Sequence, residues 1–235
     1  MAQWDKADLL ARLKRTLARP GTDEDKGPTD SDADAMLYAL LTEGQLYWTN
    51  ELATHVPDLA GLYTIEQLTT ADSGLTYSFS VEPLGHYEIR ESRNGRLLVP
   101  GAEWDPASDF IPDGKKIRFP GGITKQFASG PFARYVKTPT FIDASTEPTL
   151  QPPQARLLVV YHAAGEWAAR GGLRDPQPYW DLENRAAFGD PLHGQVGLVG
   201  ALKQSAFLIG AAGVPSGMGD WWRHISTGEG YTRTG

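Results

Sequence analysis

The sequence predicts an α+β fold, a helical bundle core interrupted by a small antiparallel β insertion and followed by an extended C-terminal arm. Three observations predict it. Leucine-rich segments at both ends of the chain have helical spacing, the middle has alternating apolar residues between turn signals, and a glycine-rich segment follows the last helix. We expect the helical core over 1–64 and 151–215, the β-rich insertion over 65–150 and the arm over 216–235.

Two helices are expected in the first 64 residues. The first has four leucines at helical spacing and ends at Pro20-Gly21. The second is expected over about 32–54, with Gly44 as a point of close packing between helices. The apolar residues that form the two stripes are Leu9, Leu10, Leu13 and Leu17 in the first helix, and Leu37, Leu40, Leu41, Trp48 and Leu52 in the second.

The β insertion is predicted from short alternating segments between turn residues. Asn94-Gly95 is a typical hairpin signal. The expected strands are 75–81, 87–92, 96–101 and 115–122, with a further extended segment over 133–143. Such short strands, separated by turns, predict antiparallel pairing.

Helical spacing returns after Pro152-Pro153, which are placed as prolines are at the start of a helix. One helix is expected over 154–170, a short one over 178–188, and a last one over 195–212. Gly171-Gly172 and Gly189 follow the first two of these helices, as glycines do at helix ends.

Composition excludes several classes of function. The chain has 235 residues and no cysteine, so disulfides, thiolate metal sites and cysteine nucleophiles are excluded. Its net charge of −7 argues against a general nucleic-acid-binding surface. No segment has the roughly 18 apolar residues of a membrane span, and the N-terminus has no apolar run typical of a signal peptide.

Motifs for catalysis or metal binding are weak, and we expect neither an enzyme nor a cofactor. His162 and Glu166 are spaced for one helix face, where a packing or surface role is favoured over an acid–base or ligand pair. Asp30, Asp32 and Asp34 resemble the start of a calcium loop, but the glycine and glutamate that such a loop requires are absent.

Three aromatic residues of the β insertion leave two interpretations open. Trp104, Phe110 and Phe119 are suited to a sugar-binding cleft, although aromatic residues in a β unit more often form its core. A glycosidase pair among the many carboxylates also stays open.

Several stretches, spread over nearly the whole chain, resemble the head-to-tail adaptor (connector, or head-completion) proteins of tailed bacteriophages. They are ADLLARLKRTLARPGTDE, TDSDADAMLYALLTEGQLYWTNELATHVP, LTTADSGLTYSFSVEPLGHYEIRESRNGRLLVPG, RGGLRDPQPYWDLENRAAFGDP, GLVGALKQS and DWWRHISTGEGY. A neighbouring neck protein, a stopper or a tail terminator, is the alternative. A hydrolase or a glycan-binding module that uses the β insertion is less favoured.

The resemblance implies a structural virion protein at the head–tail interface. Such a protein forms a homo-oligomeric ring, usually a dodecamer, beneath the portal protein. It also contacts the next neck or tail-side protein, and genomic DNA passes through its channel without sequence-specific binding. Its assembly takes place in the host cytoplasm.

Two segments are the candidate functional sites under this resemblance. The C-terminal arm is expected to dock on the portal, because tryptophans dominate interface hot spots. The acidic loop over 20–35 is expected either to line the DNA channel or to be a solvated loop. The arm residues are Trp221, Trp222, Arg223, His224, Ile225 and Tyr231, and the acidic residues are Asp23, Glu24, Asp25 and Asp30.

Overall fold

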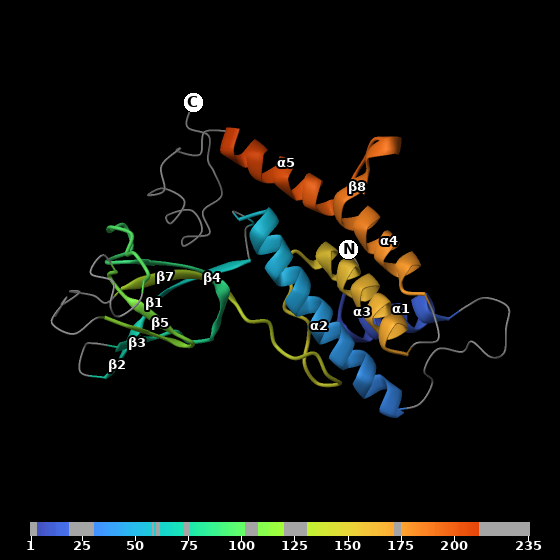
Figure 1. Ribbon diagram of the computed structural model, residues 1–235, viewed down its shortest axis with the longest axis horizontal. Helices are drawn as coiled ribbons and strands as arrows, with labels where there is room; N and C mark the ends of the chain where they lie inside the picture. Colours follow the sequence, from blue (N-terminus) through green and yellow to red (C-terminus); the bar gives the residue numbers. More distant parts are fainter. Residues whose placement is uncertain are drawn as a thin grey trace. The chain divides into compact units, whose positions relative to one another are not determined.

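The computed structural model confirms the α+β class, with α-helices and small antiparallel sheets (Figure 1). It describes residues 4–18, 31–57, 59, 62–72, 76–101, 108–119, 131–171 and 175–211. The chain divides into two compact units. The helical unit comprises Met1–Leu62 and Pro139–Ala206, and the β unit is built on Tyr63–Thr138. The division places 139–150, which we expected in the β insertion, with the helices.

Helices α1 (Lys6–Leu17) and α2 (Ser31–His55) form at the expected places. The side chain of Asp5 caps α1 by accepting a hydrogen bond from the backbone N–H of Asp8 at 2.8 Å. The predicted stripes are buried except at Leu10, which is only half-buried. They supply Leu9, Leu13 and Leu17 from α1 and Leu37, Leu40, Leu41, Trp48 and Leu52 from α2.

Helix α3 (Arg156–Gly171) is the central helix of this unit. It follows a 3-10 turn, η2 (Pro153–Ala155), and it packs against α1, α2 and α4. Contact on three sides explains why more than one stripe of α3 is buried, including the consecutive residues Leu158, Val159 and Val160. The expectation for Gly44 is confirmed, since a Cβ there would lie 2.9 Å from the backbone oxygen of Val159.

After α4 (Gln177–Phe188) the chain forms a small projection (Figure 1). Strand β8 (Gly189–Asp190), the 3-10 turn η3 (Pro191–His193) and strand β9 (Gln195–Val196) lead into α5 (Leu198–Ala211). Our prediction that the last helix begins at Gln195 is therefore wrong. Gln195 pairs with Asp190 in an antiparallel ribbon, and the tightly packed Gly197 separates the ribbon from α5.

The segment 139–150 lies on α2 and is held there by the buried side chain of Gln45. Its amide nitrogen donates to the carbonyl of Thr140 at 2.9 Å, and its amide oxygen accepts from the N–H groups of Thr149 and Leu150. This segment has no strand partner of its own, so Gln45 satisfies backbone groups that a sheet would otherwise satisfy.

The β unit contains two antiparallel sheets. The first has the order β1–β7–β4, formed by Tyr63–Gln67, Phe132–Lys137 and Pro83–Arg90. The second has the order β2–β3–β6–β5, formed by Thr69–Asp72, Thr76–Ser78, Lys116–Arg118 and Ile111–Asp113. The chain reverses at Asn94-Gly95 as predicted, with an antiparallel bridge between Arg90 and Leu97.

Three expectations for this unit need correction. The segment 96–101 makes only isolated bridges, at Leu97 and Pro100, because Pro100 has no backbone N–H to continue a ladder. The extended segment expected over 133–143 is a strand only to Lys137. Strands β1, β2 and β5 were not predicted from the sequence.

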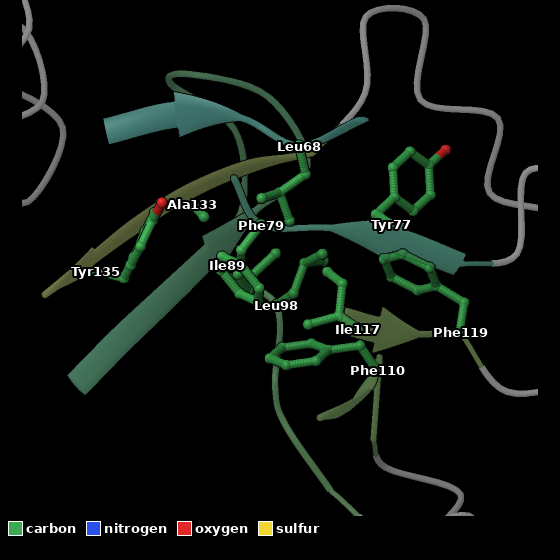
Figure 2. Packing of buried hydrophobic residues seen from close by; sticks show 10 residues of the cluster. All are labelled: Leu68, Tyr77, Phe79, Ile89, Leu98, Phe110, Ile117, Phe119, Ala133 and Tyr135. Carbon is green, nitrogen blue, oxygen red and sulfur yellow. The ribbon is translucent and has the colours of Figure 1, made fainter. Parts of the chain in front are cut away.

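One hydrophobic core lies between the two sheets. Figure 2 shows side chains from both sheets pointing toward one another, with Phe79, Ile89 and Leu98 near the middle. Phe110 and Phe119 belong to this core and are almost fully buried. The core interpretation of these two aromatic residues is therefore confirmed, whereas Trp104 lies outside the described residues.

Candidate functional site

A polar cluster lies where α2, α3 and α4 meet, and its central group is the buried carboxylate of Glu183. Oxygen Oε1 of Glu183 accepts a hydrogen bond from the indole Nε1 of Trp48 at 2.7 Å. The same oxygen lies 2.9 Å from Nδ1 of His162. Each of the three helices contributes one of these residues, so the cluster fixes the position of α4 against α2 and α3.

The ring of His162 is held between this carboxylate and an aromatic ring. Because a carboxylate oxygen only accepts, Nδ1 of His162 donates to Glu183. One face of the imidazole is stacked on Tyr47, with ring centroids 4.3 Å apart. These contacts fix the ring of His162 and suit a structural role in helix packing.

The pair of His162 and Glu166 that the sequence suggested is replaced by two other pairs. His162 bonds to Glu183 of α4, and Glu166 forms an ion pair with Arg170, one turn further along α3, at 3.3 Å. One feature of the sequence could have indicated Glu183. It is an acidic residue at helical spacing from Trp180 and the buried Ala187, on the face of α4 that packs against the other helices.

The indole of Trp180 sets how closely α4 approaches α3. A Cβ added to Gly165 would lie 2.4 Å from Nε1 of Trp180, a separation that real Cβ atoms do not show. The indole therefore occupies the space above Gly165, and α4 is fixed by packing as well as by the Glu183 cluster.

The second candidate site is the projection after α4, residues 188–197, which we call the ribbon. Its apolar side chains are exposed: Phe188 is 46% exposed, Val196 59% and Leu192 93%. Phe188 nevertheless contacts the helices, with its ring 5.4 Å from that of His55 and 6.4 Å from that of Trp48. The ribbon is thus anchored at its base and presents Leu192 at its tip.

The tip of the ribbon is held by Asp190. Oxygen Oδ1 accepts from the N–H of Leu192 at 3.0 Å, and Oδ2 lies 2.7 Å from Nδ1 of His193. The hydrogen bond with the His193 side chain holds the pKa of Asp190 below its ordinary value. Gly189 and Gly194 adopt positive φ angles of 88° and 65°, which allow the tight reversal.

In the β unit a polar network joins β1, β7 and the turn after β3. The carboxylate of Glu66 accepts from the hydroxyl of Ser80 at 2.6 Å and from that of Tyr135 at 2.9 Å. Burial, together with the hydrogen bond to Glu66, raises the pKa of Tyr135 to about 12. A phenol with this pKa is protonated at neutral pH, so the network is suited to hold structure rather than to accept protons.

An ion pair of the same sheet crosses from β7 to β4. Arg134 donates to Glu88 at 3.3 Å, and its guanidinium carbon lies 3.7 Å from the ring centroid of Tyr63 on β1. Arg134 thus connects three strands through one side chain.

The segments that the sequence singled out as sites, the arm and the acidic loop, lie outside the described residues. The arm residues concerned are Trp221, Trp222, Arg223, His224, Ile225 and Tyr231, and the loop residues are Asp23, Glu24, Asp25 and Asp30.

The described part of the chain gives two further findings. It contains no group of three or more histidine or acidic side chains placed to hold a metal ion. Among its helices, none combines the length and apolar character needed to cross a membrane.

Charge is distributed unevenly between the two units. The sequence of the helical unit has 11 Lys and Arg residues and 18 Asp and Glu residues, which gives this unit a net charge of −7. The segment 63–138 of the β unit has 9 of each and is neutral. The net charge of the protein therefore belongs to the helical unit.

Comparison of the chain with protein-family models and with curated proteins finds no match.

Proposed function

We propose that the protein is a structural component of the neck of a tailed bacteriophage, a head-to-tail adaptor. In this role it forms a ring, most simply a dodecamer, beneath the portal protein, and it joins the DNA-filled head to the next neck or tail component. It acts by assembly and carries out no reaction. The resemblance of six stretches of the sequence to adaptor proteins motivates this proposal.

The observation that carries the proposal furthest is the placement of all net charge on the helical unit. A basic lining would hold DNA by releasing its counterions, whereas an acidic lining lets the duplex slide. A ring whose helical unit faces the channel would therefore conduct DNA without retaining it.

The polar clusters of the two units fit a role in assembly. Glu183 bonds to His162 and Trp48 of two other helices, and Glu66 bonds to Ser80 and Tyr135 in the β unit. In each cluster the carboxylate bonds to side chains of the same unit, as is typical of groups that hold elements together. A glycan-binding cleft at the β insertion is less favoured, because Phe110 and Phe119 lie in the core.

Co-purification with a portal protein tests the proposal. A tagged portal ring from a phage whose genome encodes this chain is expected to retain the protein through gel filtration, in a fixed stoichiometric ratio. A protein that elutes apart from the portal and from every other neck component of the same genome would contradict the proposal.

A further inference from the structure

The turn at Asn94-Gly95 is closed by hydrogen bonds on both sides of Gly95. The N–H of Gly95 donates to the carbonyl of Ser92 at 3.0 Å, and the guanidinium of Arg90 donates to the carbonyl of Gly95, also at 3.0 Å. A Cβ added to Gly95 would lie 2.6 Å from Oγ of Ser92 and 2.8 Å from its backbone nitrogen. The backbone of Gly95 is therefore packed closely against Ser92.

The side chain of Arg96 holds the two ends of this turn together. Its guanidinium donates to Oε1 of Glu91 at 3.2 Å from Nε and at 3.1 Å from Nη2, and to both carboxylate oxygens of Asp109 at 2.9 Å. The N–H of Glu91 also donates to the carbonyl of Arg96 at 3.1 Å. Opening of the turn therefore has to break or strain these bonds.

An asparagine followed by glycine has a reactive side chain. When the backbone nitrogen of the next residue loses its proton, it can attack the side-chain carbon Cγ of the asparagine. The new C–N bond closes a succinimide ring, and ammonia leaves. Water then opens the ring at either carbonyl and gives aspartate or isoaspartate, with no change of oxidation state. Glycine favours the attack because it has no side chain to restrict the backbone.

The side chain of Asn94 is exposed, but the turn opposes this reaction in the folded chain. The attacking nitrogen is that of Gly95, and its proton is engaged by the carbonyl of Ser92. This proton has to be removed, and Gly95 has to move toward the side chain of Asn94, so the hydrogen bond to Ser92 has to break first. Folded proteins open locally in this way at a lower free-energy cost than that of global unfolding.

We infer that Asn94 is a site of spontaneous deamidation, and that the hydrogen bonds of the turn and of Arg96 limit its rate in the folded protein. The product adds a negative charge to a turn whose Arg96 is already bonded to two carboxylates. In isoaspartate the backbone also runs through Cβ and is longer by one atom, which the close packing of Gly95 on Ser92 does not accommodate. The inference is independent of the proposed function.

The test incubates the full-length chain in mildly alkaline buffer, either folded or unfolded in guanidinium chloride. Cleavage after glutamate gives the peptide 92–103, in which Asn94 is the sole side-chain amide. Mass spectrometry measures its deamidation, and chromatography separates the aspartate and isoaspartate forms. We expect Asn94 to deamidate in both samples, at least about tenfold more slowly in the folded one, because the turn has to open first.

The same samples contain internal controls. Asn50 and Asn184 are exposed on α2 and α4, and each is followed by a residue with a long side chain, Glu51 or Arg185. Both are expected to stay intact over the time in which Asn94 of the unfolded chain reacts.

A variant tests the contribution of Arg96. Arg96→Ala is expected to raise the rate in the folded chain at least about threefold and to leave the rate in guanidinium chloride unchanged. The matched control is Arg93→Ala, which removes an exposed arginine from the same turn and keeps the bonds of Arg96 to Glu91 and Asp109. It is expected to react as the wild type does, and circular dichroism is expected to show the same fold for all three proteins.

Each outcome decides a part of the inference. An Asn94 that stays intact in the unfolded chain would overturn the site. Equal rates in the folded and unfolded wild type would overturn protection by the turn, and this comparison holds even if Arg96→Ala does not fold. A folded Arg96→Ala protein that reacts at the wild-type rate would overturn the contribution of Arg96.

Discussion

The indole nitrogen of Trp48 donates to the carboxylate of Glu183 at 2.7 Å, and this hydrogen bond joins α2 to α4 through two residues that are 135 positions apart in the sequence. Both groups are buried. A buried carboxylate is stable only with hydrogen-bond partners, and Trp48 and His162 supply them. The position of α4, and of the ribbon that follows it, thus depends on this cluster.

Replacing Glu183 by alanine is expected to lower the free energy of unfolding by about 2–3 kcal/mol, because the buried Trp48 and the half-buried His162 lose their acceptor. Glu183→Gln keeps an acceptor oxygen for Trp48 and is expected to cost about 1 kcal/mol. Urea unfolding followed by tryptophan fluorescence measures both. Equal stabilities of the wild type and Glu183→Ala would show that the cluster does not hold α4.

Gly44→Ala is expected to lower the free energy of unfolding by about 1–3 kcal/mol, because the new methyl group meets the backbone oxygen of Val159 at 2.9 Å. The matched control is Gly200→Ala in α5, where the methyl group meets only the terminal carbon of Val196. That side chain can shift, so the higher helix propensity of alanine leaves the control at or above wild-type stability. Thermal unfolding of the two variants compares them directly, and a Gly44→Ala protein as stable as the control would refute close packing of α2 on α3.

Acid is expected to remove the contribution that the Asp143 carboxylate makes to the stability of the folded chain. Its carboxylate accepts from the N–H and the hydroxyl of Ser145 and from the N–H of Thr146, and these bonds lower its pKa to about 2. Since the folded pKa lies below the ordinary value of 3.8, the contribution is complete above pH 3.8 and is lost as the pH falls toward 2.

A pH series on two proteins checks this. The stability difference between the wild type and Asp143→Asn is expected to shrink as the pH falls from 3.8 to 2, and NMR titration is expected to place the carboxyl midpoint near pH 2. In Ser145→Ala the midpoint is expected to move upward. An Asp143 midpoint at its ordinary value in the wild type would contradict the hydrogen-bonding pattern.

The sequence-based proposal for the C-terminal arm makes its own prediction. Trp221→Ala combined with Trp222→Ala is expected to leave the chain folded while attachment to the portal is lost, because tryptophans at an interface centre contribute most of its binding energy. Thermal unfolding and co-purification with the portal measure the two effects. Loss of folding would instead assign both tryptophans to the core of this chain.

The helices could be predicted because each has a long stripe of apolar residues at helical spacing. The shortest strands contain too few residues to show an alternation of apolar and polar side chains. Leu9, Leu13 and Leu17 are buried as their spacing predicts. By contrast, β5 is three residues long and contains Pro112, which gives no strand signal.

The two candidate sites, the Glu183 cluster and the ribbon, could be identified only from the structure, for a different reason. Glu183 finds its partners on two other helices, and no local pattern reports such contacts. The exposure of Leu192 likewise depends on the turn that Asp190 holds. The sequence alone predicted a helix beginning at Gln195, three residues after Leu192, where the structure has the ribbon and begins α5 at Leu198.

Electron cryo-microscopy of portal particles made with and without this protein tests the central claim most directly. We expect a ring of added density coaxial with the portal, with an open channel wide enough for duplex DNA. Particles that look the same with and without the protein, with the chain found free in solution, would contradict it.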